Sequence, residues 1–368
     1  MADPRLVAAR FAHDAVGDLQ EFGDGRINDT YLVSAGTEKF ILQKINGAVF
    51  PQPELIIENM RTVTEYLRGQ IAWANPVFGG RQWQVPLLMK TRDEKDFVVD
   101  EQGGFWRALS FIADVETFAV ADNAGLAFET GFCLGWFHRL LSGLEPEKLH
   151  DTLPGFHNTP GYLRQYERDL AVTRLGGDDQ DLQYCHRFVF ERMGGAAVLE
   201  NAREMGLLAL RPIHGDPKVD NILFAVGTGK AVGIIDLDTV KPGLIHYDIG
   251  DCLRSCCNPA GEDPADTGSV FFDVERCKAA LSGYIMAAGD SLQEADYGFI
   301  FEAVRLISFE LGMRFLSDYL AGNSYFKVMD PRQNLRRAMV QFRLVESIEK
   351  NEQEINSIIN LCRDSDRK

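Results

Sequence analysis

The most informative stretch of the chain is IHGDPKVDN, residues 213–221. It puts a histidine, an aspartate and an asparagine on one short loop with the spacing H-x-D-x-x-x-x-N. Transfer of a phosphoryl group needs a carboxylate beside the accepting hydroxyl and a metal ligand close to it. We therefore expect Asp216 to orient and deprotonate a hydroxyl group, and Asn221 to bind Mg²⁺ through its amide oxygen. Lys218 is expected to offset charge on the phosphoryl group.

A second acidic motif, IIDLDT at residues 234–239, follows soon after this loop. Where the two motifs meet, residues 221–224 and 231–235 have the pattern of a short β-hairpin. A carboxylate at the end of the second hairpin strand occupies the place of the metal-binding aspartate of kinases. Asp236 is therefore the predicted main Mg²⁺ ligand, and Asp238 is a second carboxylate near it.

Two segments near these motifs are expected to have structural rather than catalytic roles. Residues 227–231, GTGKA, lack the first glycine and the final Ser or Thr of a Walker A loop, so we interpret them as the hairpin turn. We call residues 213–221 the catalytic loop. In HYDIGD, residues 246–251, we expect Asp248 to anchor this loop by accepting backbone hydrogen bonds. Helix capping by Asp248 or Asp251 is the alternative. His138, His150 and His157 have no carboxylate or cysteine at metal-ligand spacing, so packing or surface roles are expected.

The hydrophobic pattern divides the chain into two parts. The first part is rich in strands and also contains a helix; the expected strands are 28–34, 39–45, 97–99 and 106–109, and the expected helix is 53–69. Helical patterns dominate afterwards, beginning with 127–141. We predict an α+β, protein-kinase-like two-lobe fold. A small β-rich nucleotide-binding lobe would span residues 1–112, and a larger, mainly helical lobe for catalysis and substrate binding would span 113–368.

A glycine-containing loop, FGDGRIN at residues 22–28, precedes the first hairpin strand. Glycine lets backbone amides approach the phosphates of ATP closely. The nucleotide-binding candidates in this loop are therefore Gly23, Gly25 and Asn28.

The basic residue that anchors the phosphates is expected on the following strand. Gln43 and Lys44 are adjacent there and must point to opposite faces. Lys44 carries the charge, whereas Gln43 stands where the kinase pattern V-A-I-K has its lysine. Both remain candidates for ATP binding, and the helical carboxylate partner is either Glu58 or Glu65.

Composition limits the classes of partner. The chain has 368 residues and a formal net charge of −16, which argues against nucleic-acid binding and against docking on an anionic membrane. Seven scattered cysteines show no zinc spacing and no disulfide framework. Neither a signal peptide nor a membrane span is expected, so the sequence favours a cytoplasmic protein.

Together these motifs resemble the aminoglycoside phosphotransferase superfamily, which includes choline and homoserine kinases. Within it the chain is most similar to the bacterial N-acetylhexosamine 1-kinases, over nearly its whole length. The segments that carry the resemblance are GDGRINDTY (23–31), FILQ (40–43), GFWR (104–107), IDLDT (235–239) and GMRFLSDYL (312–320). The resemblance implies ATP and Mg²⁺ as cofactors, a small-molecule substrate and a monomer.

The same resemblance implies phosphorylation of the anomeric hydroxyl of N-acetylglucosamine or N-acetylgalactosamine. It also implies that Arg314 and Tyr325 help to hold the sugar near Asp216, although Arg314 could instead be a surface or ion-paired helix residue. The chain departs from those kinases in two places. It has His-Gly-Asp where they have His-Asn-Asp, and Arg26 stands where they have a histidine near the sugar.

Three functions therefore stay open at this stage. The first is an N-acetylhexosamine 1-kinase, and the second is a kinase of the same fold for another sugar, choline, homoserine or an aminoglycoside. The third is a pseudokinase that binds nucleotide without catalysis, against which the presence of Asp216, Asn221 and Asp236 argues.

Overall fold

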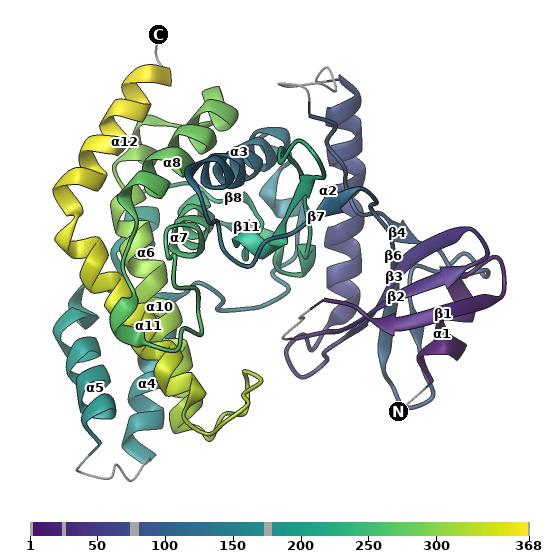
Figure 1. Cartoon of the computed structure of the whole chain (residues 1–368), viewed down its shortest axis with the longest axis horizontal. Helices are drawn as coiled ribbons and strands as arrows, with labels where there is room; N and C mark the ends of the chain where they lie inside the picture. Colours follow the sequence, from purple (N-terminus) through teal and green to yellow (C-terminus); the bar gives the residue numbers. More distant parts are fainter. Residues whose placement is uncertain (1–2, 24–26, 74–80, 173–178, 367–368) are drawn as a thin grey trace.

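The computed structural model of the chain describes residues 3–23, 27–73, 81–172 and 179–366. An antiparallel sheet near the N-terminus lies at one end of the molecule and a group of helices at the other, with the long helix α2 (Pro53–Trp73) between them (Figure 1). This arrangement confirms the predicted α+β fold class.

The N-terminal sheet consists of strands that pair antiparallel. Its order is β1-β2-β3-β6-β4, and β5 also pairs with β6. The strands are β1 (Val16–Glu21), β2 (Asp29–Ala35), β3 (Glu38–Ile45), β4 (Leu88–Met89), β5 (Val98–Val99) and β6 (Phe105–Ser110). The predicted hairpin at 28–45 is thus confirmed as β2 and β3, which turn at Gly36 with φ of 59°.

The two faces of β3 pack against different partners. Phe40 and Leu42 are buried in a cluster with residues of the short helix α1 (Pro4–Phe11). Ile45 is buried on the other face, in a cluster with Ile56 of α2. Because side chains alternate along a strand, Gln43 shares the face of Ile45, and Lys44 shares the face of Phe40 and Leu42.

The C-terminal part is mainly helical, as predicted. Its helices are α3 (Ala124–Leu141), α4 (Thr159–Val172), α5 (Gln180–Arg192), α6 (Val198–Glu204), α7 (Ile245–Cys256), α8 (Val274–Ala288), α9 (Glu294–Tyr297), α10 (Ile300–Leu320), α11 (Gln333–Lys350) and α12 (Glu352–Asp366). Two small sheets lie among them: β10-β9-β7 and β11-β8. Their strands are β7 (Val115–Glu116), β8 (Arg211–Ile213), β9 (Ile222–Ala225), β10 (Ala231–Ile234) and β11 (Lys241–Gly243). The proposed lobe boundary at residue 112 falls between β6 and β7.

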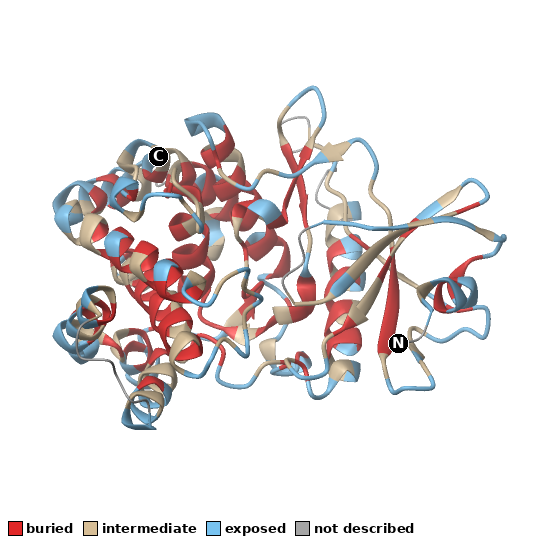
Figure 2. Cartoon of the chain, turned by 60° about the horizontal axis from the view of Figure 1, so that its bottom comes forward, coloured by how far each residue is buried: buried red, intermediate tan, exposed pale blue. Residues whose placement is uncertain are grey.

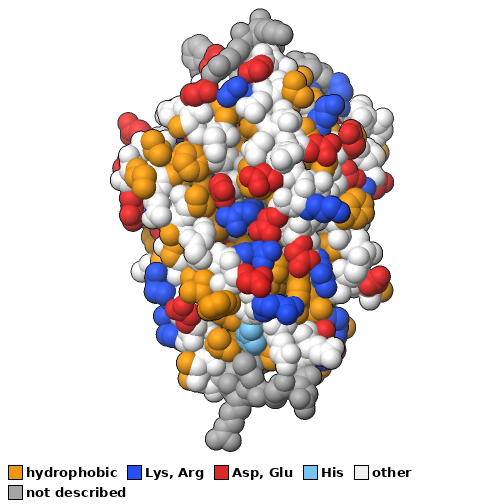
Figure 3. Space-filling view, turned by 90° about the vertical axis from the view of Figure 1, so that its left-hand side faces the viewer, with side chains coloured by type: hydrophobic (Ala, Val, Ile, Leu, Met, Phe, Trp, Pro, Cys, Tyr) orange, Lys and Arg blue, Asp and Glu red, His pale blue; other side chains and the backbone are white. Residues whose placement is uncertain are grey.

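Buried residues are concentrated on the inner sides of the helices and on strands β6, β9 and β10 (Figure 2). The outer sides of the helices and most of β1 are exposed. The end of the helical part that faces away from the sheet carries acidic and basic side chains intermixed (Figure 3). Within the described part of the chain, no helix combines the length and apolar character needed to cross a membrane.

Helices α3 and α8 approach each other closely through glycines. A Cβ atom added at Gly131 would lie 1.9 Å from the carbonyl oxygen of Ala280, and one at Gly283 would lie 2.1 Å from that of Phe128. Both distances are far shorter than van der Waals contact, so the two backbones can pack this way only without side chains.

We expect the Gly283→Ala substitution to lower the free energy of unfolding by about 1–3 kcal/mol, because the new methyl group would push α8 away from α3. Urea denaturation checks this. The matched control is Gly69→Ala in α2, where an added Cβ meets no atom within 4 Å and gains helix propensity of up to about 1 kcal/mol. Equal destabilisation by the two substitutions would contradict the packing argument.

Candidate active site

The catalytic loop connects β8 to β9 and lies beside the segment that follows β10. Strand β8 pairs with β11, which begins shortly after Asp236, so the two sequence motifs are held next to each other. Gly215 has φ of 89°, and a Cβ there would lie 2.8 Å from the carbonyl oxygen of Thr239. The backbone can make this turn because residue 215 is glycine.

Asp248 of α7 anchors the catalytic loop, which confirms the prediction for this residue. Its carboxylate accepts hydrogen bonds from the backbone amides of His214 (2.7 Å) and Gly215 (2.8 Å). Nε2 of His138 lies 2.8 Å from the same carboxylate. Burial alone would raise the pKa of Asp248, but the bond to His138, the charge interactions with both histidines and the His214 amide lower it. The loop is thus fixed to a buried anion.

Asp216 and Lys218 lie side by side on the loop. Nζ of Lys218 is 3.3 Å from Oδ2 of Asp216, and the pKa of Lys218 is raised, mainly by that carboxylate. The Asn221 amide donates to the backbone oxygen of Asp216 at 2.7 Å and to its Oδ2 at 3.3 Å. Among the described residues no donor is hydrogen-bonded to the Asn221 amide oxygen, so this oxygen can ligate a cation.

Asp236 follows β10 in a left-handed conformation, with φ of 64° and ψ of 58°. Non-glycine residues adopt this conformation uncommonly, and such residues cluster at functional sites. Its side chain is open to solvent, although protein lies around it on most sides. That surrounding protein and the charges of Asp238 and Asp216 raise the pKa of Asp236 to about 7. Among the described residues no group of three or more Asp, Glu, His or Cys side chains is placed to hold a metal ion. The Asp236 carboxylate and the Asn221 amide oxygen are nevertheless hard oxygen ligands of the kind that Mg²⁺ prefers.

Asp238 connects the helical part of the molecule to the N-terminal sheet. One of its oxygens accepts a hydrogen bond from Nδ2 of Asn28 at 2.7 Å, and the other is paired with Arg107 of β6. The Asn28 amide oxygen also accepts a bond from the backbone of Asn46 at 3.0 Å. Asn28 and Asp238, predicted as nucleotide and metal ligands, therefore contact each other in this structure.

Gln43 and Lys44 point in opposite directions. The Gln43 amide oxygen accepts two bonds from Arg107, and its nitrogen donates to Thr30 at 3.2 Å, so Gln43 belongs to the network that includes Asp238. Nζ of Lys44 lies 5.6 Å from the centre of the Trp106 ring, on the other face of the sheet. The predicted helical partner Glu58 is paired instead with His150 at 2.9 Å, and Glu65 is exposed.

The glycine-containing loop is described only in part. Gly23 has φ of 74°, and the amide of Phe22 donates to the carbonyl oxygen of Thr30 at 2.9 Å. The ring of Phe22 lies 6.3 Å from that of Phe111, just after β6. The predicted residues Gly25 and Arg26 lie outside the described residues.

A sequence model of the phosphotransferase enzyme family matches residues 18–272, which include both acidic motifs and the glycine-containing loop. The chain belongs to the phosphotransferase enzyme family.

Solved structures agree with this membership at the level of the fold. An aminoglycoside phosphotransferase from Alicyclobacillus acidocaldarius is 13% identical, with a TM-score of 0.59 over 100% of this chain and 97% of the other. A spectinomycin phosphotransferase, solved with ADP and spectinomycin, is 12% identical with a TM-score of 0.57 and covers 96% and 99%. A choline kinase from Cryptosporidium parvum is 13% identical with a TM-score of 0.57 and covers 92% and 91%.

On the helical side of this phosphotransferase, Arg314 of α10 is enclosed by aromatic rings. Its guanidinium carbon lies 5.0 Å from the centre of the Phe156 ring, 5.2 Å from that of Tyr162 and 5.5 Å from that of Phe326. Among the described residues no hydrogen-bond or ion-pair partner is found for the guanidinium. Burial opposes its charge, but nearby groups, among them Tyr162, Tyr325 and Asp216, raise its pKa. The ring of Tyr325 packs against that of Phe326, with 4.8 Å between the ring centres, so Tyr325 belongs to the same cluster as Arg314. The charge of Asp216 also acts on Arg314.

His157 holds the catalytic loop from the other side. Its Nε2 lies 2.7 Å from the carbonyl oxygen of Gly215, and its Nδ1 lies 3.1 Å from the buried carboxylate of Glu310. Both ring nitrogens face acceptors, so the imidazolium form satisfies both. Burial opposes protonation, but the hydrogen bond and charge of Glu310 outweigh it and raise the pKa of His157.

This raised pKa predicts a pH-dependent contribution to stability. The contribution is fully present below the ordinary histidine pKa of about 6.5 and is lost as the pH rises through the higher pKa of the folded state. We expect His157→Asn, which tolerates the positive φ of 62° at this position, to destabilise the protein by about 1–3 kcal/mol at about pH 6 and by less at about pH 9. Unfolding curves at both pH values check this. The partly exposed His150→Asn is the control, and a pH-independent difference would contradict the assignment.

Local sequence patterns did not reveal three supporting residues of the site, namely Arg107, His157 and Glu310. Arg107 lies directly opposite Gln43 in the β3–β6 pairing, so a correct strand register would have pointed to it. His157 and Glu310 are separated by 153 residues, and no local signal connects them.

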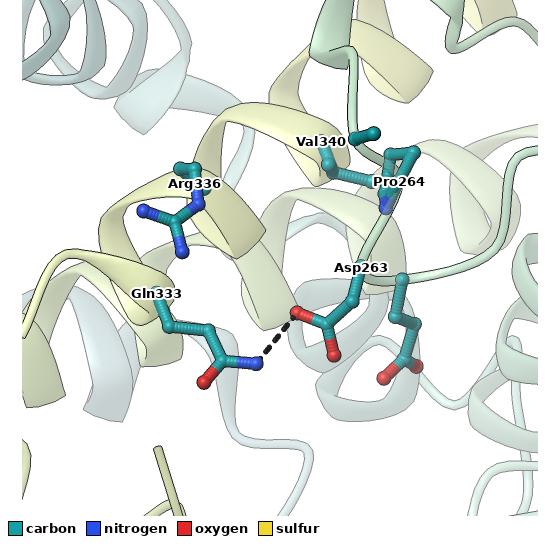
Figure 4. A pocket seen from close by; sticks show the side chains of 7 residues that line it. Asp263, Pro264, Gln333, Arg336 and Val340 are labelled. Carbon is teal, nitrogen blue, oxygen red and sulfur yellow. Dashed lines mark hydrogen bonds between the residues drawn. The ribbon is translucent and has the colours of Figure 1, made fainter. Parts of the chain in front are cut away.

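A separate hollow of about 220 Å³ lies between the segment after α7 and helix α11 (Figure 4). Asp263 in its wall accepts a bond from Gln333 at 3.2 Å and forms a two-pronged ion pair with Arg337. The predicted site residues do not line this hollow, and we assign it no catalytic role.

Proposed function

We propose that this protein transfers the γ-phosphate of ATP to a hydroxyl group of a neutral, hydroxyl-rich small molecule, with an N-acetylhexosamine as the first candidate. Family membership supports phosphoryl transfer. Structural neighbours with the same fold include an aminopropanol kinase and a choline kinase, so the fold accommodates small alcohols as acceptors.

The observation that carries the choice of acceptor is the unpartnered guanidinium of Arg314 near Asp216. Its N–H groups can donate to hydroxyl, acetamido or other acceptor oxygens, and the aromatic rings around it offer flat apolar surfaces. A cationic acceptor such as choline or an aminoglycoside would be repelled by this charge. The carbohydrate class therefore fits better than the amino-alcohol class.

In the proposed reaction, Asp216 accepts the proton of the acceptor hydroxyl group. At the same time, the oxygen of that hydroxyl group forms a bond to the γ-phosphorus. The bond between that phosphorus and the bridging oxygen breaks, and ADP leaves with the bond electrons. Asn221 and Asp236 would hold Mg²⁺, which when bound neutralises charge on the phosphates. Lys218 lies beside Asp216 and would stabilise negative charge on the transferred group.

Transfer assays with Mg-ATP and a panel of acceptors test this proposal. The panel contains N-acetylglucosamine, N-acetylgalactosamine, simple hexoses, choline, homoserine and kanamycin. We expect phosphorylation of sugars and not of the cationic acceptors. The variant Arg314→Met should raise KM for the sugar more than it changes ATP binding. Preferred turnover of choline or kanamycin would overturn the acceptor class while leaving phosphoryl transfer intact.

A further inference from the structure

The residue that strand β3 contributes to the network at Asp238 is uncharged. Gln43 lies on that face, whereas the charged Lys44 lies on the opposite face beside Trp106. A nucleotide-dependent phosphotransferase nevertheless needs positive charge against the phosphates of its nucleotide. The cation must therefore come from another element.

Arg107 of β6 lies where this charge is needed. β6 is the neighbour of β3 in the sheet (Figure 1), and Arg107 is the direct cross-strand partner of Gln43. The Gln43 amide oxygen accepts bonds from its Nε (3.0 Å) and Nη2 (2.7 Å), and Nη2 also pairs with Asp238. Arg107 is fully buried, yet its Nη1 has no partner among the described residues. A buried, unpartnered cationic donor is costly unless a ligand completes it.

The surroundings of Arg107 match those of a phosphate-anchoring cation. Asp238 gives it a buried carboxylate partner, the role that a helical glutamate plays for the strand lysine of protein kinases. Asp238 follows Asp236 by two residues, so its ion pair with Arg107 brings the guanidinium to the edge of the proposed metal site.

We propose that Arg107 is the residue that binds the nucleotide phosphates, with Gln43 and Asp238 as positioning residues that aim its free Nη1. This inference rests on the proposed function, because it needs a nucleotide in the cleft. Because two neighbours fix the guanidinium, its remaining N–H groups keep one orientation. They can therefore donate to phosphate oxygens with little further loss of side-chain conformational entropy. The sheet would therefore supply its phosphate-binding charge from β6 rather than from β3.

Nucleotide titrations with purified full-length protein test this proposal. Calorimetry would compare adenosine, ADP and ATP, the last two with Mg²⁺, for the wild type and for Arg107→Met. We expect ADP and ATP to bind about 10- to 100-fold more weakly to the variant and adenosine to bind equally well. A purely structural role of Arg107 would weaken all three ligands together, and this result would overturn the proposal.

Two further variants make the test specific. Lys44→Met removes the neighbouring charge on the opposite face; if it weakens ADP binding while Arg107→Met does not, the proposal is wrong. Gln43→Lys in the Arg107→Met background returns a cation to β3 and should restore part of the ADP affinity. If this double variant binds adenosine but recovers no affinity for ADP, the proposed role of a cation at the Arg107 site in phosphate binding is contradicted.

If Arg107→Met does not fold, the double variant Arg107→Gln, Asp238→Asn removes both buried charges together and is titrated in the same way. The proposed function and the proposed role of Arg107 can be contradicted by different results. A wild-type protein that binds no ADP or ATP would overturn the proposed function and this inference with it. A wild type that binds and turns over ATP, next to an Arg107→Met variant with unchanged ADP affinity, would overturn the inference alone.

Discussion

The Asp216→Asn variant is expected to lose about 10²- to 10⁴-fold in kcat while it keeps its fold and its affinity for ATP. Asparagine preserves the shape of the side chain but cannot accept the hydroxyl proton. The backbone of the loop is held independently by Asp248 and His157, so the loop should stay in place. Steady-state turnover, nucleotide titration and thermal unfolding measure the three quantities.

The matched control is Asp290→Asn, the same chemical change at an exposed position between α8 and α9. It should leave turnover unchanged. Turnover close to that of the wild type in Asp216→Asn would show that another group accepts the proton. Loss of ATP affinity in the same variant would show that Asp216 acts in nucleotide binding.

The second large effect is expected for Asp236→Asn. We expect kcat/KM to fall by at least about 10²-fold, because the substitution removes the charged oxygen that would hold Mg²⁺ against the phosphates. Raising the Mg²⁺ concentration should recover part of the activity, since a weakened site can still be filled by mass action. Activity as a function of Mg²⁺ concentration, at fixed ATP, is the measurement.

Thermal stability gives this variant a second readout. Asp236 lies close enough to Asp216 and Asp238 for their charges to raise its pKa. Removing one of three neighbouring carboxylates relieves repulsion, so the metal-free variant should unfold at the same temperature as the wild type or at a higher one. A strongly destabilised variant would mean that Asp236 is a structural residue and that the loss of activity follows from misfolding.

Short-range patterns predicted the elements that depend on neighbouring residues. The β2–β3 hairpin, helix α2 and the β9–β10 hairpin follow from alternation, helical spacing and glycine turns, and all are present. The catalytic loop and Asp236 could be identified because their chemistry requires particular residues at fixed spacing. The roles proposed for them remain predictions.

Contacts between distant residues could not be predicted in the same way. The choice between Gln43 and Lys44 depends on which face of β3 packs against α1, which is a tertiary property. Asp238 finds its partners 210 residues away at Asn28 and 131 residues away at Arg107. No single-sequence pattern encodes such distances, because the chain between the partners can adopt many arrangements of equal local propensity.

The roles of two histidines also depend on contacts between distant residues. Packing or surface roles were expected for His138 and His157 because neither has a carboxylate or cysteine at metal-ligand spacing in the sequence. In the fold, His138 bonds Asp248 and His157 bonds Glu310, so both support the catalytic loop. Their function as supports depends on helices that meet only after folding.

Whether a hydroxyl group receives the γ-phosphate of ATP can be determined by following that phosphate. ³¹P NMR of a reaction with Mg-ATP and N-acetylglucosamine would follow the phosphorus atom. We expect an ADP signal together with an equal amount of a sugar phosphomonoester, and neither in the Asp216→Asn variant. Release of inorganic phosphate alone, with every acceptor of the panel unmodified, would contradict this expectation.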